Sequence, residues 1–171
     1  MKMLGGILLG MSVLVAPAMA ASATAQGQTP ALEFVFSELV TLGKGISPGT
    51  TAYGSRNIVP ITGGTFEGPN IRGAVMPGGW DWQLQRADGC SDVKADYMLR
   101  TDDGVVINIL NQGALCAPAP GKPLTARTIV RLEAPIGKYD WLSKHAFVGT
   151  LELATAPDGG PAVRIGIWMV N

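Results

Sequence analysis

The sequence predicts an all-β protein, with about eight to ten short antiparallel strands closed into a single barrel. Three observations favour this fold. No segment combines a helical apolar repeat with helix start and stop signals. Within residues 54–89, eight glycines and three prolines separate short β-prone pieces. Asp-Gly pairs at Asp103 and Asp158 follow strand-like segments, as they do in hairpin turns.

The N-terminal strands can be placed in chain order. The first covers residues 32–40, which are rich in β-branched and aromatic side chains and carry no helical stripe. Residues 43–53 are polar and are predicted to be a loop. Three strands follow within the glycine-rich run, over residues 56–61, 71–76 and 80–86. Because glycine permits unusual backbone angles and proline fixes φ, we expect tight turns here that bend the sheet around a pocket.

A hairpin is predicted over residues 96–101 and 105–111, because the turn-like sequence TDDG lies between them. Cys90 and Cys116 are equidistant from position 103, so this hairpin would bring them together at its open end. In an oxidising compartment such a pair forms a disulfide, which should contribute about 3 kcal/mol of stability. Two distant cysteines and one histidine are too few ligands for a metal site, and no metal or cofactor is expected.

The C-terminal part adds three more expected strands, over residues 124–134, 145–155 and 162–170. The last two form a closing hairpin around a PDGG turn. An irregular segment, residues 135–143, precedes this hairpin and is anchored by Tyr139. No composition break, linker or repeat divides the chain, so the sequence predicts one barrel domain.

The first twenty residues have the pattern of a secretory signal peptide. Lys2 supplies a positive charge, residues 3–15 are apolar, and Ala18-Met19-Ala20 forms a small-residue cleavage site. The apolar stretch is short and interrupted by glycine, which disfavours a retained membrane anchor. Residues 21–30 are predicted to be a flexible leader, and residues 31–171 the barrel. The expected location is therefore the periplasm or the outside of the cell, with no membrane contact after cleavage.

The charge pattern argues against nucleic acid as a partner. Thirteen basic and thirteen acidic residues balance, and no basic patch or long charge run is present. Loss of Lys2 with the signal peptide would leave a net charge of −1. A small molecule is the expected partner, and the oligomeric state stays open.

Several motifs resemble those of an uncharacterised UPF/DUF family of small β-barrel proteins. The N-terminal matches are GGTFxGP at 63–69, Gly73, PGGxDWQ at 77–83, Arg86 and Asp88-Gly89. The later matches are Tyr97, the turn 101–104, NxG at 111–113, YxWL at 139–142 and FVG at 147–149. The resemblance covers nearly all of the chain after the signal peptide. It implies a lipocalin-like or calycin-like barrel and no particular activity.

The polar and aromatic residues of these motifs are the candidate site residues. In a regular strand Asp81 and Gln83 share one face, while Trp82 and Arg86 share the other. Asp81 is a candidate general acid or base if an apolar wall raises its pKa, and Tyr97 is a candidate phenolic donor. The candidate ligand-binding residues are Arg56, Glu67, Trp82, Arg86, Asp88 and Trp141.

These observations leave three functions open. The leading one is binding of a small, partly apolar, oxygen-bearing ligand in the barrel mouth. The alternative is a cofactor-independent isomerase, lyase or cyclase that uses acid–base residues of the same pocket. The third is a structural or interaction protein with a filled barrel. For the charged residues themselves, the alternative to a role in a site is a structural network that joins Arg56 or Arg86 to Asp81 or Asp88 and ties the turns together. An enclosed pocket that holds Asp81, Arg56 or Arg86 and has an aromatic wall would favour the first two. A solidly packed barrel with these groups outside would favour the third.

Overall fold

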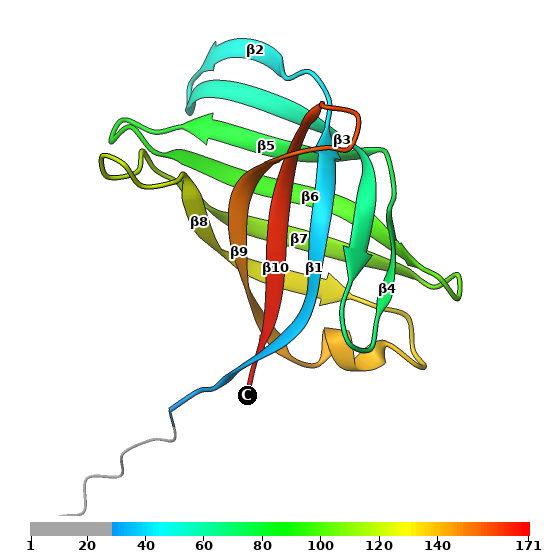
Figure 1. The fold of residues 1–171 in the computed structure, drawn as a ribbon. Coiled ribbons are helices and arrows are strands. Elements are labelled where there is room, and N and C mark those ends of the chain that lie inside the picture. The colour runs from blue at the N-terminus through cyan, green and yellow to red at the C-terminus, as the bar shows by residue number, and fades with distance from the viewer. Residues whose placement is uncertain (1–28) are drawn as a thin grey trace, which may run out of the picture.

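Ten strands form one antiparallel sheet that closes on itself in the computed structural model (Figure 1). The structure describes residues 29–171, so the predicted signal peptide and most of the predicted leader lie outside the described residues. The strands are β1 (Leu32–Leu42), β2 (Ile46–Thr51), β3 (Gly54–Glu67), β4 (Arg72–Val75), β5 (Gly79–Gln85), β6 (Ser91–Thr101), β7 (Val106–Leu115), β8 (Thr125–Glu133), β9 (Ala146–Thr155) and β10 (Pro161–Val170).

The sheet order explains how the barrel closes. The strands follow one another as β1-β10-β9-β8-β7-β6-β4-β3-β2, and β1 also pairs with β3. Strand β5 pairs with β3 and β6, beside β4, so β4 and β5 together fill one position between those two strands. The result is a closed eight-strand antiparallel barrel with two extra strands, which confirms the predicted fold class.

Strand β3 turns the corner that makes this closure possible. Its first half pairs with β2 and β5, and its second half pairs with β1 and β4. The change of partners coincides with Gly63 and Gly64, whose φ angles are 143° and 137°. A Cβ on Gly64 would collide with the carbonyl oxygen of Leu39 on β1. Only glycine therefore lets β1 approach β3 at the seam of the barrel.

The loop prediction for residues 43–53 was wrong in one respect, because β2 lies within it. All six residues of β2 are exposed, and the strand pairs only with β3. Its sequence includes Pro48 and Gly49, which are tolerated in an edge strand. Since neither face of β2 is buried, its sequence carries no alternation of apolar and polar residues.

One end of the barrel is filled and capped. Phe36, Leu99, Ile107, Ile109 and Ile167 are fully buried there. The short 3₁₀-helix η1 (Asp140–Ser143) lies at this end, whereas β2 lies at the other (Figure 1).

The capping segment, residues 138–143, is also held in place by polar contacts. The hydroxyl of Tyr139 donates to Asp103 at 3.0 Å, and the ammonium of Lys138 donates to the same carboxylate at 2.7 Å. The hydrogen bond from Lys138 comes first among the causes that lower the pKa of Asp103 to about 2. The turn between β6 and β7 is thereby joined to the cap, and the free volume of the barrel is left at the opposite end.

The disulfide joins Cys90 and Cys116 at the open end of the β6–β7 hairpin. Their neighbours Ser91 and Leu115 face each other in the strand register, as the symmetric spacing predicts. Replacing both cysteines by serine should lower the free energy of unfolding by about 3 kcal/mol, because the unfolded chain regains the entropy of an open loop. Urea unfolding of the double variant and of the wild type, each with and without reductant, measures this. Reductant should destabilise only the wild type. Equal stability of the wild type and the double variant without reductant would contradict the prediction.

Candidate functional site

A cavity of about 100 Å³ lies inside the barrel, towards the end away from η1. Most of its lining is apolar, from Val40, Leu42, Ile61, Val93, Ala95, Leu115, Leu151, Leu153, Val163 and Ile165. The polar lining residues are Asp81, Gln83, Tyr97, Asn111 and Thr128. None of the described residues that line it is Lys, Arg or His. One water needs only about 10–15 Å³ of such volume, so the cavity has room for part of a small molecule.

Tyr97 joins this cavity to a buried carboxyl group. It points inward from β6, and its hydroxyl donates to Oε1 of Glu38 on β1 at 2.6 Å. Strands β1 and β6 are not paired in the sheet, so this hydrogen bond crosses the barrel interior. Glu38 is 1% exposed and Tyr97 is 2% exposed. The pair is therefore held away from solvent.

Burial sets the protonation state of the pair. Loss of hydration raises the pKa of Glu38 to about 8, although the hydrogen bond from Tyr97 acts in the opposite direction. Burial likewise raises the pKa of the Tyr97 phenol well above its usual value of 10. At neutral pH both groups are uncharged and carry two acidic hydrogens. Tyr97 lines the cavity and Glu38 does not, so a proton of this pair can reach a ligand through the Tyr97 hydroxyl, with Glu38 behind it as the proton source.

Asp81 is the second carboxyl group of the cavity. Its Oδ2 accepts from Nε2 of Gln83 at 2.8 Å, and its Oδ1 accepts from the backbone N–H of Lys94 at 3.1 Å. The Gln83 side chain is fixed in turn by Nδ2 of Asn57 at 2.8 Å. Burial raises the pKa of Asp81, and these two hydrogen bonds oppose the rise. Because both donors favour the carboxylate, Asp81 is oriented to accept a proton.

Several polar atoms in the interior have no hydrogen-bond partner within the described part of the chain. They are Oε2 of Glu38, Nδ2 and Oδ1 of Asn111, and Oγ1 of Thr128. Buried polar atoms are almost always paired, since an unpaired one costs about 1–3 kcal/mol. Asn111 and Thr128 line the cavity, and unpaired polar atoms in a cavity wall are typical of a site that acquires its partners from a bound molecule or water.

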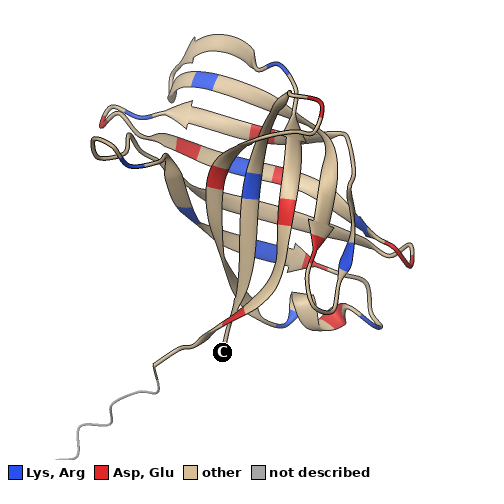
Figure 2. Ribbon diagram, viewed as in Figure 1, with Lys and Arg blue, Asp and Glu red and all other residues tan. Residues whose placement is uncertain are grey.

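The structure brings only two of the predicted site residues into this cavity, Asp81 and Tyr97. Arg86 lies on the surface, where it forms ion pairs with Asp88 and Asp92. The structural Arg–Asp network that the sequence left open is therefore present, but without Asp81. Lys and Arg are scattered over the described strands and loops, with no basic face (Figure 2).

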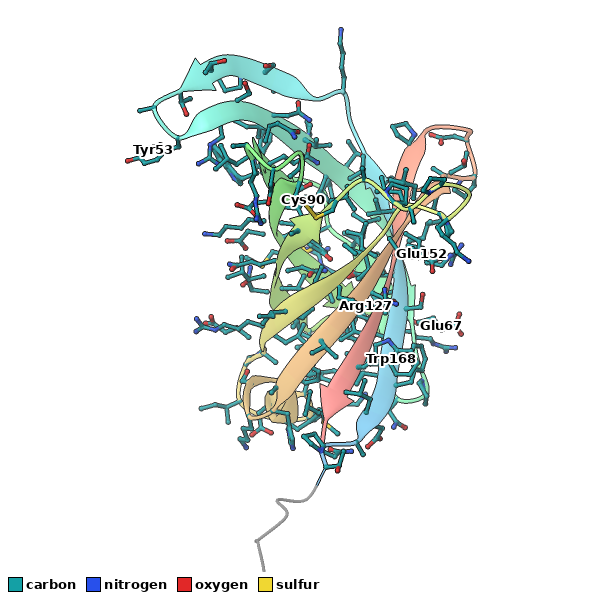
Figure 3. The ribbon with its side chains drawn as sticks, turned by 90° about the vertical axis from the view of Figure 1, so that its left-hand side faces the viewer. Tyr53, Glu67, Cys90, Arg127, Glu152 and Trp168 are labelled. Carbon is teal, nitrogen blue, oxygen red and sulfur yellow. A yellow bond between two sulfur atoms is a disulfide. The ribbon has the colours of Figure 1, made fainter. Side chains whose placement is uncertain are left out.

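The other predicted ligand-binding residues lie elsewhere on the barrel. Arg56 and Trp82 line an outer groove beside β2, and Trp82 is 46% exposed. Glu67 projects from the outer surface (Figure 3). Trp141 packs against Phe147 at the capped end, with ring centroids 6.4 Å apart. These residues do not contribute to the wall of the inner cavity.

Sequence analysis missed Glu38, Asn111 and Thr128. A signal for Glu38 was present, because it lies between Phe36 and Val40 at the alternate positions of one strand face. A carboxyl group on the face that carries the core side chains is unusual and indicates a function or a partner. The described residues contain no group of three or more potential metal ligands. They also contain no helix with the length and hydropathy to span a bilayer.

Comparison with known proteins places the chain among its relatives. A family model described as "Protein of unknown function (DUF3237)" matches residues 30–170. A UPF0311 protein of Rhodopseudomonas palustris is 35% identical over 136 residues, which cover 71% of this chain and 89% of that protein. The crystal structure of a β-barrel-like protein of Acinetobacter baumannii superposes with a TM-score of 0.75 at 28% identity, over 86% of this chain and 99% of that one.

A fungal relative carries a functional name. A hydroalkoxylation enzyme of Penicillium herquei is 31% identical over 121 residues, which cover 71% of this chain and 74% of that protein. The family model spans nearly all of the described barrel, including both the cavity and the cap. The chain therefore belongs to the DUF3237 family.

Proposed function

We propose that this barrel is a cofactor-independent enzyme that adds the O–H bond of a hydroxyl group across a C=C bond of the same small, uncharged molecule, or catalyses the reverse elimination. The observation that carries the proposal is the neutral Glu38–Tyr97 pair at the wall of an apolar cavity. A neutral carboxylic acid behind the cavity wall is a source of protons, which an addition to a C=C bond requires. Ligand binding, the leading hypothesis from the sequence, becomes the first step of this function.

The residues divide the reaction between an acid and a base. The Asp81 carboxylate accepts the proton of the substrate hydroxyl, and the oxygen forms a bond to one alkene carbon. The π bond breaks, and its electrons take a proton from the Glu38–Tyr97 pair at the other carbon. Glu38 is then ionised and Asp81 protonated. Return of the proton from Asp81 across the cavity to Glu38, through the Tyr97 hydroxyl, restores the starting state. No atom is lost, so substrate and product are isomers.

Two further observations support this chemistry. Hydroalkoxylation is the addition of an alcohol O–H across a C=C bond, and the Penicillium herquei relative bears that name. The cavity lining offers hydrocarbon contacts, the Asp81 carboxyl group and the Tyr97 hydroxyl, but no cation. An anionic substrate would therefore enter without a charge partner, which is costly in such a site. A neutral alkenol or alkenyl phenol contains the hydroxyl group and the C=C bond that the reaction needs, and it carries no charge.

We also propose that the enzyme works in the periplasm or outside the cell. The N-terminal signal-peptide pattern motivates this location. The Cys90–Cys116 disulfide supports it, because disulfides persist mainly in oxidising compartments.

Deuterium transfer tests the proposed reaction directly. The protein is incubated in D₂O with 4-methylpent-4-en-1-ol, which contains a hydroxyl group and a terminal C=C bond. The expected product is 2,2-dimethyltetrahydrofuran with one deuterium in a methyl group, detected by mass spectrometry and NMR. A wider set of small alkenols and allyl phenols extends the test, and the saturated 4-methylpentan-1-ol is the control. Binding of these alkenols without any carbon-bound deuterium would reject the enzyme and leave a binding protein.

A further inference from the structure

We propose that Asn111 and Thr128 form a binding site for the hydroxyl group of an uncharged alcohol or phenol, beside the Glu38–Tyr97 pair. This inference rests on the proposed function only in that it concerns the same cavity. It assigns the chemical class of the ligand and does not require that a reaction take place.

Asn111 is the more informative of the two residues. It faces inward from β7, is 3% exposed and lies between the fully buried Ile109 and the glycine Gly113 on the same strand face. The other asparagines within the barrel strands are paired: Nδ2 of Asn57 donates to Gln83, and Nδ2 of Asn108 donates to Asp96. Only the amide of Asn111 has both its donor and its acceptor unpaired in the described strands. A purely structural asparagine would not be left in that state.

The side-chain amide of Asn111 lies near the Tyr97 hydroxyl of the Glu38–Tyr97 pair. Asn111 lies close enough to the Tyr97 hydroxyl to oppose the rise in the pKa of Tyr97, although neither amide atom reaches hydrogen-bond geometry with a protein group. Both residues line the cavity. A ligand oxygen held by Asn111 would therefore lie next to the general acid.

Thr128 supplies a second polar group from the next strand. In the sheet register it faces Gly113 on β7 and Gly149 on β9. A Cβ on Gly113 would come within 2.8 Å of Cγ2 of Thr128, and a Cβ on Gly149 would collide with Oγ1 of Thr128. Two glycines thus leave the room that the threonine side chain occupies. Its hydroxyl has no partner, and its inward neighbours on β8, Ala126 and Val130, are apolar.

The unpaired atoms define the chemistry of the ligand. Asn111 offers one donor group and one acceptor, and the Thr128 hydroxyl can serve as either. A hydroxyl group matches this set because it also donates and accepts. A carboxylate only accepts, and here it would meet the Asp81 carboxylate without a cation in the cavity lining. A pure hydrocarbon would leave the polar atoms unpaired.

The test compares three unreactive probes of one shape. They are 3-methylbutan-1-ol, 1-fluoro-3-methylbutane, in which fluorine replaces the hydroxyl group, and the carboxylate 3-methylbutanoate. Dissociation constants are measured by NMR titration at pH 7 for the wild type and for Asn111→Leu and Thr128→Val, which keep the volume of the side chain. The matched control is Asn108→Leu, which makes the same chemical change at a paired asparagine outside the cavity.

We expect the wild type to bind the alcohol at least tenfold more tightly than the carboxylate. Asn111→Leu should weaken alcohol binding about tenfold and leave the affinity for the fluoro compound unchanged or higher, because only the alcohol loses its hydrogen bonds. Thr128→Val should give a smaller loss with the same selectivity. Asn108→Leu should change neither affinity.

Three outcomes would overturn the assignment. Equal loss for the alcohol and the fluoro compound in both variants would mean that Asn111 and Thr128 only shape the cavity. Unchanged affinities would mean that water alone satisfies the two side chains. No binding of the alcohol by the wild type would remove the site altogether. Because the probes contain no C=C bond, this result is independent of the deuterium experiment. Selective binding of 3-methylbutan-1-ol, together with no deuterium transfer to the alkenol, would reject the proposed reaction and leave the binding site standing.

Discussion

Glu38→Gln should lower the rate of deuterium transfer to carbon by about 10²–10⁴-fold, the range typical of a lost general acid. Glutamine has nearly the same shape as glutamic acid, and its carbonyl oxygen can still accept the hydrogen bond from Tyr97. Its amide cannot release a proton to an alkene carbon. Binding of the alkenol should therefore persist while turnover is lost, and single-turnover kinetics in D₂O measure the difference.

The matched control is Glu67→Gln, which makes the same change on the outer surface. It should leave the rate unchanged. Tyr97→Phe should also reduce the rate, because it removes the group that links Glu38 to the cavity. A Glu38→Gln variant that folds, binds the alkenol and transfers deuterium at the wild-type rate would show that Glu38 is not the acid.

The free energy of unfolding should fall as the pH rises from about 4.5 to about 8, because of Glu38. Folding raises the pKa of this carboxyl from its ordinary value of 4.5 to about 8. Between those values the unfolded chain has released the proton while the folded chain retains it. Each further pH unit therefore lowers the free energy of the unfolded state relative to that of the folded state. The slope is up to about 1.4 kcal/mol per pH unit for one group. Below pH 4.5 both states are protonated, and this contribution vanishes.

Glu38→Gln should remove this slope, which makes the variant more stable than the wild type at pH 8 relative to pH 4.5. Urea unfolding at half-unit pH intervals measures both curves. Asp103 does not interfere, since its lowered pKa of about 2 means that its contribution is lost only as the pH falls below about 4. Parallel curves for the two proteins across pH 4.5–8 would exclude a buried, neutral Glu38.

The fold was more predictable than the site for a physical reason. Strands such as β8 alternate buried and exposed residues with a period of two, and that pattern is local. The β6–β7 hairpin and its disulfide follow from the symmetric spacing of Cys90 and Cys116 about one turn. Strand β2 was not predictable, because it is exposed on both faces and exists only through pairing with β3.

The site depends on which residues meet across the barrel, and that information is not local. The alternation along β5 correctly separates Asp81 from Trp82, but it does not say which face turns inward. Glu38 and Tyr97 are 59 positions apart and meet only because β1 closes on β3. Arg86 was a candidate ligand-binding residue, but its partners Asp88 and Asp92 already pair with it at the surface.

The contrast between the capped and the hollow end of the barrel has a consequence for how such a protein can diversify. The core at the capped end includes fully buried side chains such as Leu142 of η1, where lost volume costs several kcal/mol. The rim of the cavity is built from residues such as Leu42, Leu115 and Leu153, which end or border different strands, and Leu153 is 63% exposed. Substitutions at the rim change the shape of the entrance at little cost in stability. The entrance of the cavity can thus change in shape while the buried Glu38–Tyr97 pair beneath it stays in place.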